Sequence, residues 1–383
     1  MNTTEIPREN PELTAEKKAK LLEFTEQELQ KMDSVVLPLL ELRHKLFDVN
    51  QTEYSKDLPI KDQLYDHPSN NIDFINHDMG LRRGNALKYH QTTEKYDRGL
   101  SEEHAERDFI YRQAILKAAQ ELGFITNHPG VAKDPTSREL GILDSELEPI
   151  PEKVAAVVMD PGAGKTGVKR LWETKLNIES GAINTDRIIV SSSARVLDDG
   201  EKGRTKPYDA GDTEFETAKL TVEKLFGATF DDEESEIPME FGENLTAKVV
   251  KTTAMIGDRL VTIEIIETPF DPDRQMSDGS KAKRTNTTEA YLGMLPLLEG
   301  TDGPLVVVSH DTWKPWQNLI GHGIFTLTQG RDVYTAGPFN SDRLYVAEEN
   351  GEKVLDINAP QDVVDEIIKT YDQLVRLQLS LQS

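Results

Sequence analysis

Cysteine is absent from the 383 residues of this chain, and so is any long apolar run. Without cysteine, the chain has neither a disulfide framework nor a thiolate zinc site. A membrane-spanning helix needs roughly 20 apolar residues, whereas the apolar segment 35–42 is already interrupted by Pro38 and Glu41. Residues 1–10 also lack the basic and apolar regions of a secretion signal, so we expect a cytoplasmic protein.

Positive charge is scarce as well, because 44 Lys and Arg residues face 68 Asp and Glu residues, for a formal net charge of -24. An acidic protein is repelled by nucleic-acid backbones and by anionic membranes. No histidine pair has the helical spacing of a zinc site, and the acidic segment 271–278 lacks the terminal glutamate of a calcium loop, so no metal site is predicted. The composition favours a small molecule as the ligand. A protein partner, or a second copy of the chain, would bind through the N-terminal helices.

The sequence pattern changes near residue 151. Before this point, apolar residues recur at helical spacing in three segments, 14–32, 35–46 and 101–122. A break between the first two is expected near Asp33 and Ser34. After this point, apolar strands alternate with helices, which is typical of a parallel sheet. We therefore predict a helical N-terminal module with its linker at 1–150, and a Rossmann-like α/β domain at 151–383 with a mostly parallel sheet flanked by helices.

Apolar runs in the second part predict strands at 154–159, 187–191, 261–266, 305–309 and 344–348. Helical spacing predicts helices at 167–179, 213–226, 287–298 and 361–379. The acidic segment 231–236 is expected to be a solvated loop. Because parallel strands end at one edge of a sheet, the polar segments that follow these strands should converge on one ligand site.

The first polar segment, 159–166, reads Met-Asp-Pro-Gly-Ala-Gly-Lys-Thr. It resembles a phosphate-binding loop in which Met159 replaces the first glycine. Independently of that motif, Gly162 and Gly164 let backbone N–H groups approach an anion at the start of the next helix, beside Asp160. A nucleotide-binding protein of the P-loop type is therefore one alternative.

The second polar segment places the hydroxyls of Ser191, Ser192 and Ser193 and the guanidinium of Arg195 at the end of a strand. These groups suit a carboxylate, a ribose or a phosphate. They could equally cap a turn and form a surface ion pair. Glu214 opens the next helix, where the helix dipole favours a carboxylate whatever its function.

A third segment contains Glu267 and, further along the chain, Arg284, Asn286, Thr287 and Glu289. Carboxylates accept hydrogen bonds, so the glutamates of these segments would hold ribose hydroxyls or a cationic centre. Arg284, Asn286 and Thr287 add polar groups at the start of a helix. We take them as ligand-binding candidates and Glu289 as a candidate catalytic residue.

The fourth segment brings His310 to the end of a strand, with Trp313 nearby to stack or shield. A histidine beside carboxylates can act as a general base near neutral pH, so His310 is the main proton-transfer candidate. A histidine bonded only to loop backbone is the alternative. The chain has no Gly-x-Ser-x-Gly elbow, so Ser309 and His310 do not form a hydrolase triad on sequence grounds.

Taken in order, these segments resemble the YdcF/SanA/ElyC-like family, a Rossmann-like group of uncertain biochemical function, over roughly residues 152–320. The chain departs from the family at Ser192 and Ser193, which replace a double glycine, and at Ala290, which replaces an asparagine. The positions that carry the resemblance are 157–164, Arg170, 191–193, Thr213, Glu214, Glu267, 286–289, Ser309 and His310.

For the soluble branch of that family, the resemblance implies binding of S-adenosylmethionine or a similar nucleoside, without an established methyl acceptor. It also adds Arg170 to the expected ligand-binding residues. We therefore expect a protein that binds a nucleoside-type or anionic metabolite at the carboxyl ends of the strands, with the reaction open. The alternatives are P-loop-type nucleotide binding through residues 162–166, and a non-enzymatic scaffold that acts through the helical module.

Overall fold

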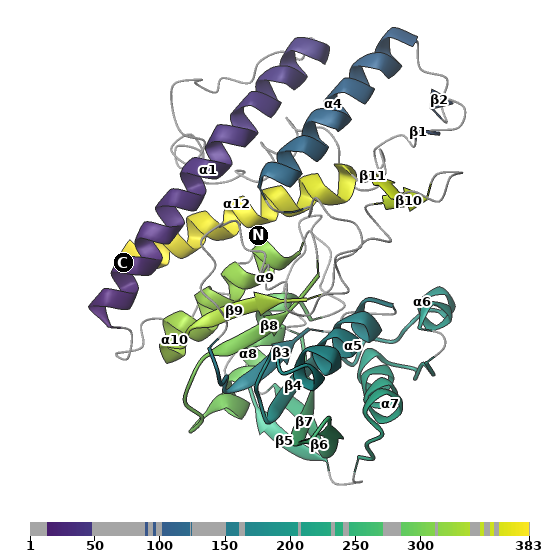
Figure 1. Ribbon diagram of the computed structural model, residues 1–383, viewed down its shortest axis with the longest axis vertical. Coiled ribbons are helices and arrows are strands. Elements are labelled where there is room, and N and C mark those ends of the chain that lie inside the picture. The colour runs from purple at the N-terminus through teal and green to yellow at the C-terminus, as the bar shows by residue number, and fades with distance from the viewer. Residues whose placement is uncertain are drawn as a thin grey trace.

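A seven-stranded mixed sheet with helices on both faces forms the centre of the computed structural model, and three long helices lie beside it (Figure 1). The structure describes residues 14–47, 89–90, 95–96, 102–122, 124, 151–160, 165–205, 208–230, 234–239, 245–270, 285–310, 313–337, 345–347, 353–355 and 360–382.

The strand order in the sheet is β5-β6-β7-β4-β3-β8-β9. The five strands from β7 to β9 are parallel to their neighbours, whereas β6 is antiparallel to β7 and β5 is antiparallel to β6. This arrangement confirms the predicted α/β class with a mostly parallel sheet flanked by helices. The bounds are β3 Ala156–Met159, β4 Arg187–Ser192, β5 Ser235–Pro238, β6 Thr246–Ile256, β7 Arg259–Glu267, β8 Leu305–Val308 and β9 Val333–Ala336.

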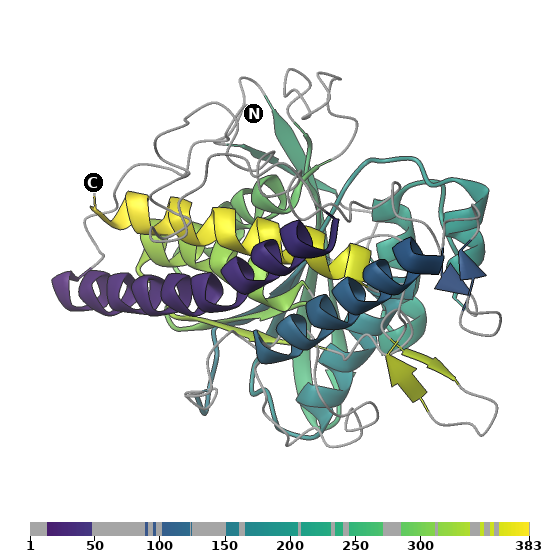
Figure 2. The ribbon, with the colours of Figure 1, turned by 90° about the horizontal axis from the view of Figure 1, so that it is seen from above.

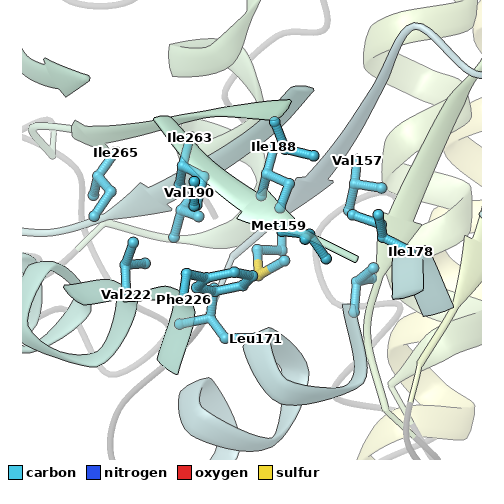
Figure 3. Packing of buried hydrophobic residues seen from close by; sticks show 14 of the residues in the cluster. Val157, Met159, Leu171, Ile178, Ile188, Val190, Val222, Phe226, Ile263 and Ile265 are labelled. Atoms are coloured by element: carbon cyan, nitrogen blue, oxygen red, sulfur yellow. The ribbon is translucent and has the colours of Figure 1, made fainter. Parts of the chain in front are cut away.

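One face of the sheet packs against α5 and α7, where Leu171 and Phe226 meet alternate residues of β3, β4 and β7 (Figure 3). The other face packs against α8, α9 and the π-helix η2, through residues such as Met294 and Phe325. Covered on both faces, β3 and β8 are buried at every residue, which explains their continuous apolar runs. The bounds are α5 Lys165–Glu179, α6 Asp199–Arg204, α7 Glu214–Phe226, α8 Thr287–Leu298, α9 Lys314–Gly321, η2 His322–Thr326 and α10 Leu327–Gln329.

The first and last long helices share a hydrophobic core. In both ribbon views, α12 (Pro360–Gln382) lies beside α1 (Ala15–Phe47) and α4 (Glu102–Glu121) (Figures 1 and 2). Apolar side chains from all three helices, among them Leu29 and Ile115, form one buried cluster that also includes Leu319 of α9. The C-terminal helix therefore completes the core of the N-terminal helices, and the predicted domain boundary at residue 150 stays a prediction.

The predicted helix break near Asp33 and Ser34 is wrong, because α1 is continuous through both residues and through Pro38. Polar side chains can disfavour a helix by competing with its backbone, but Ser34 bonds to a carbonyl within α1 itself and Asp33 is bound by a residue of another helix. The Ser34 hydroxyl donates to the carbonyl of Lys31 at 2.7 Å, and Asp33 Oδ1 accepts a hydrogen bond from the Tyr371 hydroxyl at 2.9 Å. Packing against α12 thus keeps the helix intact.

Several strands differ from the sequence-based expectation. The prediction misses β5, β6 and β9, and it is partly wrong for the acidic segment 231–236, because the exposed residues Ser235 and Glu236 belong to β5. The apolar run 344–348 does not join the main sheet: β10 (Tyr345–Ala347) pairs only with β11 (Lys353–Leu355). Another small pair is formed by β1 (Tyr89–His90) and β2 (Lys95–Tyr96).

No helix within the described ranges is both long enough and apolar enough to cross a membrane. The expected cytoplasmic location has no structural test and stays a prediction.

His322, the first residue of η2, makes stability depend on pH. Its ring lies 6.1 Å from that of Phe24 in α1, and its Nδ1 is 3.0 Å from the Thr326 hydroxyl. Burial lowers the pKa of His322 to about 4, against an opposing effect of Asp332. Between pH 6.5 and pH 4 the unfolded chain therefore binds more protons at this site, and the folded state loses stability as the pH falls.

We expect His322→Gln to remove about 1–2 kcal/mol of the stability difference between pH 7 and pH 5. Urea unfolding of both proteins at the two pH values measures this difference. The carboxylates titrate in both proteins, so their contribution cancels in the comparison. An unchanged pH dependence in the variant would contradict the neutral state of His322 in the folded protein.

Candidate functional site

The sheet has a topological switch point between β3 and β8. The chain passes from β3 to β4 and then to β7 on one side, and it returns through α8 to place β8 on the other side of β3. Ligands of open α/β sheets bind outside the carboxyl ends of the strands at such a point. Among the described residues, Asp160, Ser193, Thr268 and Ser309 directly follow β3, β4, β7 and β8 and lie at this edge.

On the α5 side of the sheet, Arg170 joins the ends of β3 and β8. Its side chain is buried, and its Nη1 donates a hydrogen bond to the carbonyl of Asp160. Its Nε and Nη2 lie 3.1 Å and 2.7 Å from Nδ1 of the buried His310. The ring of Trp313 lies 4.2 Å from the His310 ring and 5.6 Å from the guanidinium carbon. The structure thus brings Asp160 and Trp313 together with the buried Arg170 and His310, and we call these four expected residues the Arg170 cluster.

On the α8 side, hydroxyl groups connect the strand ends to the start of α8. The hydroxyls of Ser191 and Thr268 are 2.8 Å apart, and the Thr285 hydroxyl donates to the Thr268 carbonyl at 2.7 Å. Thr287 donates to Oδ2 of Asp160 at 3.3 Å. Asp160 therefore contributes to both faces, with its carbonyl bound by Arg170 and its carboxylate facing α8.

Three buried hydroxyls near these strand ends, those of Ser192, Tyr291 and Ser309, have no hydrogen-bond partner among the described atoms. Tyr291 and Ser309 are 0% exposed and Ser192 is 5% exposed. Burial raises the pKa of Tyr291, the nearby Asp160 carboxylate raises it further, and Arg170 opposes both. An unsatisfied buried hydroxyl costs about 1–3 kcal/mol, so three of them make this sheet edge the candidate site.

Tyr291 was missed by the sequence analysis. It lies on the core-facing side of α8, where an aromatic residue is expected to pack in the core. Its ring does stack on that of Phe325, with the ring centroids 5.4 Å apart. Only the three-dimensional structure reveals that its hydroxyl reaches the charged groups of the site. Ser309, in contrast, is the last residue of the predicted strand 305–309 and directly follows the observed β8, and that position was the available signal.

Arg195 and Glu214 use their hydrogen-bonding groups within the protein. The guanidinium of Arg195 donates to both carboxylate oxygens of Glu201, at 2.9 Å and 3.0 Å, and to Oε1 of Glu214 at 2.7 Å. Glu214 Oε2 also accepts from the Ser193 hydroxyl. This bidentate network links the end of β4 to α6 and α7. It is an ion pair within the protein, as in the alternative to ligand binding, but it is partly buried rather than at the surface.

Asn286 and Glu289 form a capping box at the start of α8. The Asn286 side chain accepts a hydrogen bond from the backbone N–H of Glu289 at 2.7 Å, and Glu289 Oε2 accepts one from the backbone N–H of Asn286 at 2.9 Å. Glu289 is 1% exposed. Both residues thus satisfy backbone donors that a helix N-terminus otherwise leaves unpaired.

Replacing the cap residue Asn286 by alanine is expected to lower the free energy of unfolding by about 1 kcal/mol, because the Glu289 N–H loses its acceptor. Thr213→Ala is the matched control, since Thr213 and Glu216 form the same capping box on α7, away from the Arg170 cluster. Urea unfolding should give similar losses for both variants. A much larger loss for Asn286→Ala would indicate a role beyond capping.

Glu267 lies at the end of β7 with 16% of its side chain exposed, and its Oε2 is 3.9 Å from Nζ of Lys248. Burial raises the pKa of its carboxyl, and the charges of Glu234 and Glu216 add to this effect, while Lys248 opposes it. Of the three glutamates that the sequence suggested as ligand acceptors, Glu267 is the one without an Arg partner or a helix-capping role in the described contacts.

Gly162, Gly164 and Arg284 lie outside the described residues. Their predicted roles in ligand binding therefore stay predictions. What the structure does describe is the start of α5 at Lys165, soon after β3 ends at Met159. Across the described parts of the chain, no group of three His, Asp or Glu residues is arranged to hold a metal ion.

Comparison of the chain with protein-family models, with curated proteins and with solved structures gives no match. The resemblance to the YdcF/SanA/ElyC-like family therefore stays a prediction.

Proposed function

We propose that this chain binds a small anionic or nucleoside-type metabolite at the carboxyl ends of β3, β4, β7 and β8. The observation that carries the proposal is the set of three buried hydroxyls without partners, those of Ser192, Tyr291 and Ser309, at the topological switch point. Buried polar groups in native proteins normally have hydrogen-bond partners. A ligand that occupies this edge would supply them.

The charges at the site favour an anionic group in the ligand. Arg170 brings a buried positive charge to the ends of β3 and β8, and the N-terminus of α5 adds the positive end of a helix dipole at the same edge. Two of the carboxylates that were expected to meet a cationic centre, those of Glu214 and Glu289, are bound within the protein. S-adenosylmethionine stays a candidate, with Glu267 as the acceptor for its ribose or its sulfonium.

Nucleotide binding of the P-loop type is the second candidate, because α5 begins at Lys165 directly after a strand and a glycine-containing segment. One feature disfavours it. Met159 occupies the position of the first motif glycine, and it is a buried residue of β3 that packs in the core. A phosphate-binding loop would have to start one residue later and be correspondingly shorter.

A thermal-shift screen of the full chain tests the proposal. The panel contains S-adenosylmethionine and its demethylated product, adenosine and its 5′-monophosphate, ATP with and without magnesium, sugar nucleotides and inorganic phosphate. A ligand at 100 times its Kd stabilises the native state by about 2.7 kcal/mol. Stabilisation by the S-adenosyl compounds alone would support binding of a nucleoside-type ligand. A magnesium-dependent ATP shift that Lys165→Ala abolishes would support the P-loop.

Two variants, Ser309→Ala and Tyr291→Phe, test whether these hydroxyls contact the ligand. Each removes a buried hydroxyl that lacks a partner, so each should leave the free protein as stable as before or up to about 1 kcal/mol more stable. Each should also reduce the shift caused by the ligand. Ser235→Ala in the exposed edge strand β5 is the control and should change neither quantity. Silence across the panel would contradict the proposal and favour a scaffold that acts through α1 and α4.

A further inference from the structure

The contact between Arg170 and His310 determines which nitrogen of the histidine carries a proton. A guanidinium has five N–H donors, no acceptor, and a charge that it keeps at any physiological pH. Nε and Nη2 of Arg170 both lie within hydrogen-bond distance of His310 Nδ1, at 3.1 Å and 2.7 Å. Nδ1 must therefore be the acceptor, and it carries no proton.

A neutral imidazole without a proton at Nδ1 has its proton at Nε2. A doubly protonated ring would point its Nδ1–H group and a second positive charge at the buried guanidinium. The contact with Arg170 therefore opposes protonation of Nδ1. The ring cannot easily escape the contact by rotating, because Trp313 packs against it with ring centroids 4.2 Å apart. Arg170 thus holds His310 in one tautomer and one orientation.

We infer that Arg170 is a positioning residue that keeps His310 as the neutral Nε2–H tautomer, so that His310 donates a hydrogen bond to an oxyanion of the ligand. This inference rests on the proposed function and names the chemistry of the group that is bound, a phosphate or a carboxylate. This role differs from that of the general base expected from the sequence. A base needs an available lone pair, and in this tautomer the lone pair of the ring nitrogens lies on Nδ1 and faces Arg170.

The tautomer can be measured without any ligand. The chain has 8 histidines, and long-range ¹H–¹⁵N spectra of the ¹⁵N-histidine-labelled full chain separate protonated from unprotonated ring nitrogens. The signals of His310 are those that disappear in His310→Gln. At pH 7 we expect an unprotonated Nδ1 and a protonated Nε2. An Nδ1–H tautomer or an imidazolium at this pH would overturn the inference.

Variants of Arg170 test whether this residue sets the tautomer of His310. Arg170→Lys keeps a side chain that only donates, so the Nε2–H form should persist. In Arg170→Gln the amide can donate or accept, and we expect a mixture of tautomers. If the lysine variant loses the Nε2–H form while the glutamine variant keeps it, Arg170 does not set the tautomer. If neither variant folds, the spectrum of the unmodified chain still decides.

The chemical class of the ligand is tested by titration with adenosine 5′-monophosphate and, as the uncharged control, adenosine. The monophosphate should move the His310 Nε2 signal and adenosine should not. A ligand from the thermal-shift panel that binds without moving this signal would overturn the oxyanion assignment while leaving the proposed binding function intact. If the expected tautomer is observed but no ligand of the panel binds, the proposed function fails. The conclusion that Arg170 sets the tautomer of His310 would still stand.

Discussion

Gly337→Ala is expected to lower the free energy of unfolding by about 3 kcal/mol or more and to displace the end of β8. Gly337 follows β9 with a φ of +153°, and a Cβ atom placed on it would lie 1.7 Å from the carbonyl oxygen of Ser309 and 2.6 Å from its carbonyl carbon. Both neighbours are backbone atoms, so no rotation of a side chain relieves the clash. Ser309 and His310 would have to move together, and ligand binding should be lost as well.

Gly300→Ala is the matched control for this variant. Gly300 also has a positive φ, of +68°, but nothing lies within 4 Å of the added Cβ. Alanine there should cost only the conformational penalty of about 1 kcal/mol. Urea unfolding of both variants separates backbone strain from steric clash. Equal losses would mean that β9 and β8 adjust easily, and that Gly337 does not fix the position of Ser309.

Arg170→Met should abolish the thermal shift by any anionic ligand and should cost about 3 kcal/mol of stability. The methionine side chain replaces only the aliphatic part of the arginine. It cannot donate hydrogen bonds to the Asp160 carbonyl or to His310 Nδ1, which would then lose these donors. Lys175→Met is the control on the same helix, where only an i,i+4 pair with Glu179 at 3.6 Å is lost. That change should cost at most about 0.5 kcal/mol.

A stability loss for Arg170→Met without any loss of ligand binding would contradict the proposed site, because it would reduce Arg170 to a structural residue. Retained stability together with lost binding would instead strengthen the proposal, since the guanidinium would then act on the ligand. Measuring unfolding and thermal shift on the same preparations distinguishes these results.

The strands that build the site were predictable, because a strand covered on both faces must be apolar along its whole length. This is why the runs at β3, β4, β7 and β8 stood out, and why α8 was predicted with the same bounds, 287–298, that the structure has. β6 was missed although its burial alternates along most of its length, because the buried Thr252 and the exposed Met255 break the match between apolar residues and buried positions.

The partners of the polar residues were not predictable. The sequence indicates that Arg195, Glu214 and Glu289 lie near the strand ends, but a carboxylate that binds a ligand and one that binds a neighbouring arginine have the same local sequence. The pairing of Arg195 with Glu201 and Glu214, and that of Glu289 with Asn286, depend on where α6, α7 and α8 begin. The Arg170 cluster similarly requires the position of α5 relative to β8, which spans 140 residues of chain.

The shared core of α1, α4 and α12 has a consequence for how the protein is made. The hydrogen bond between Asp33 and Tyr371 joins residues 338 positions apart in the chain. At a synthesis rate of about 5–20 residues per second, α1 waits roughly 17–70 s on the ribosome before α12 exists. During that time the apolar stripe of α1, including Leu29 and Met32, lacks its C-terminal partner. In newly made chains, this part of the core therefore stays incomplete until translation reaches the last helix.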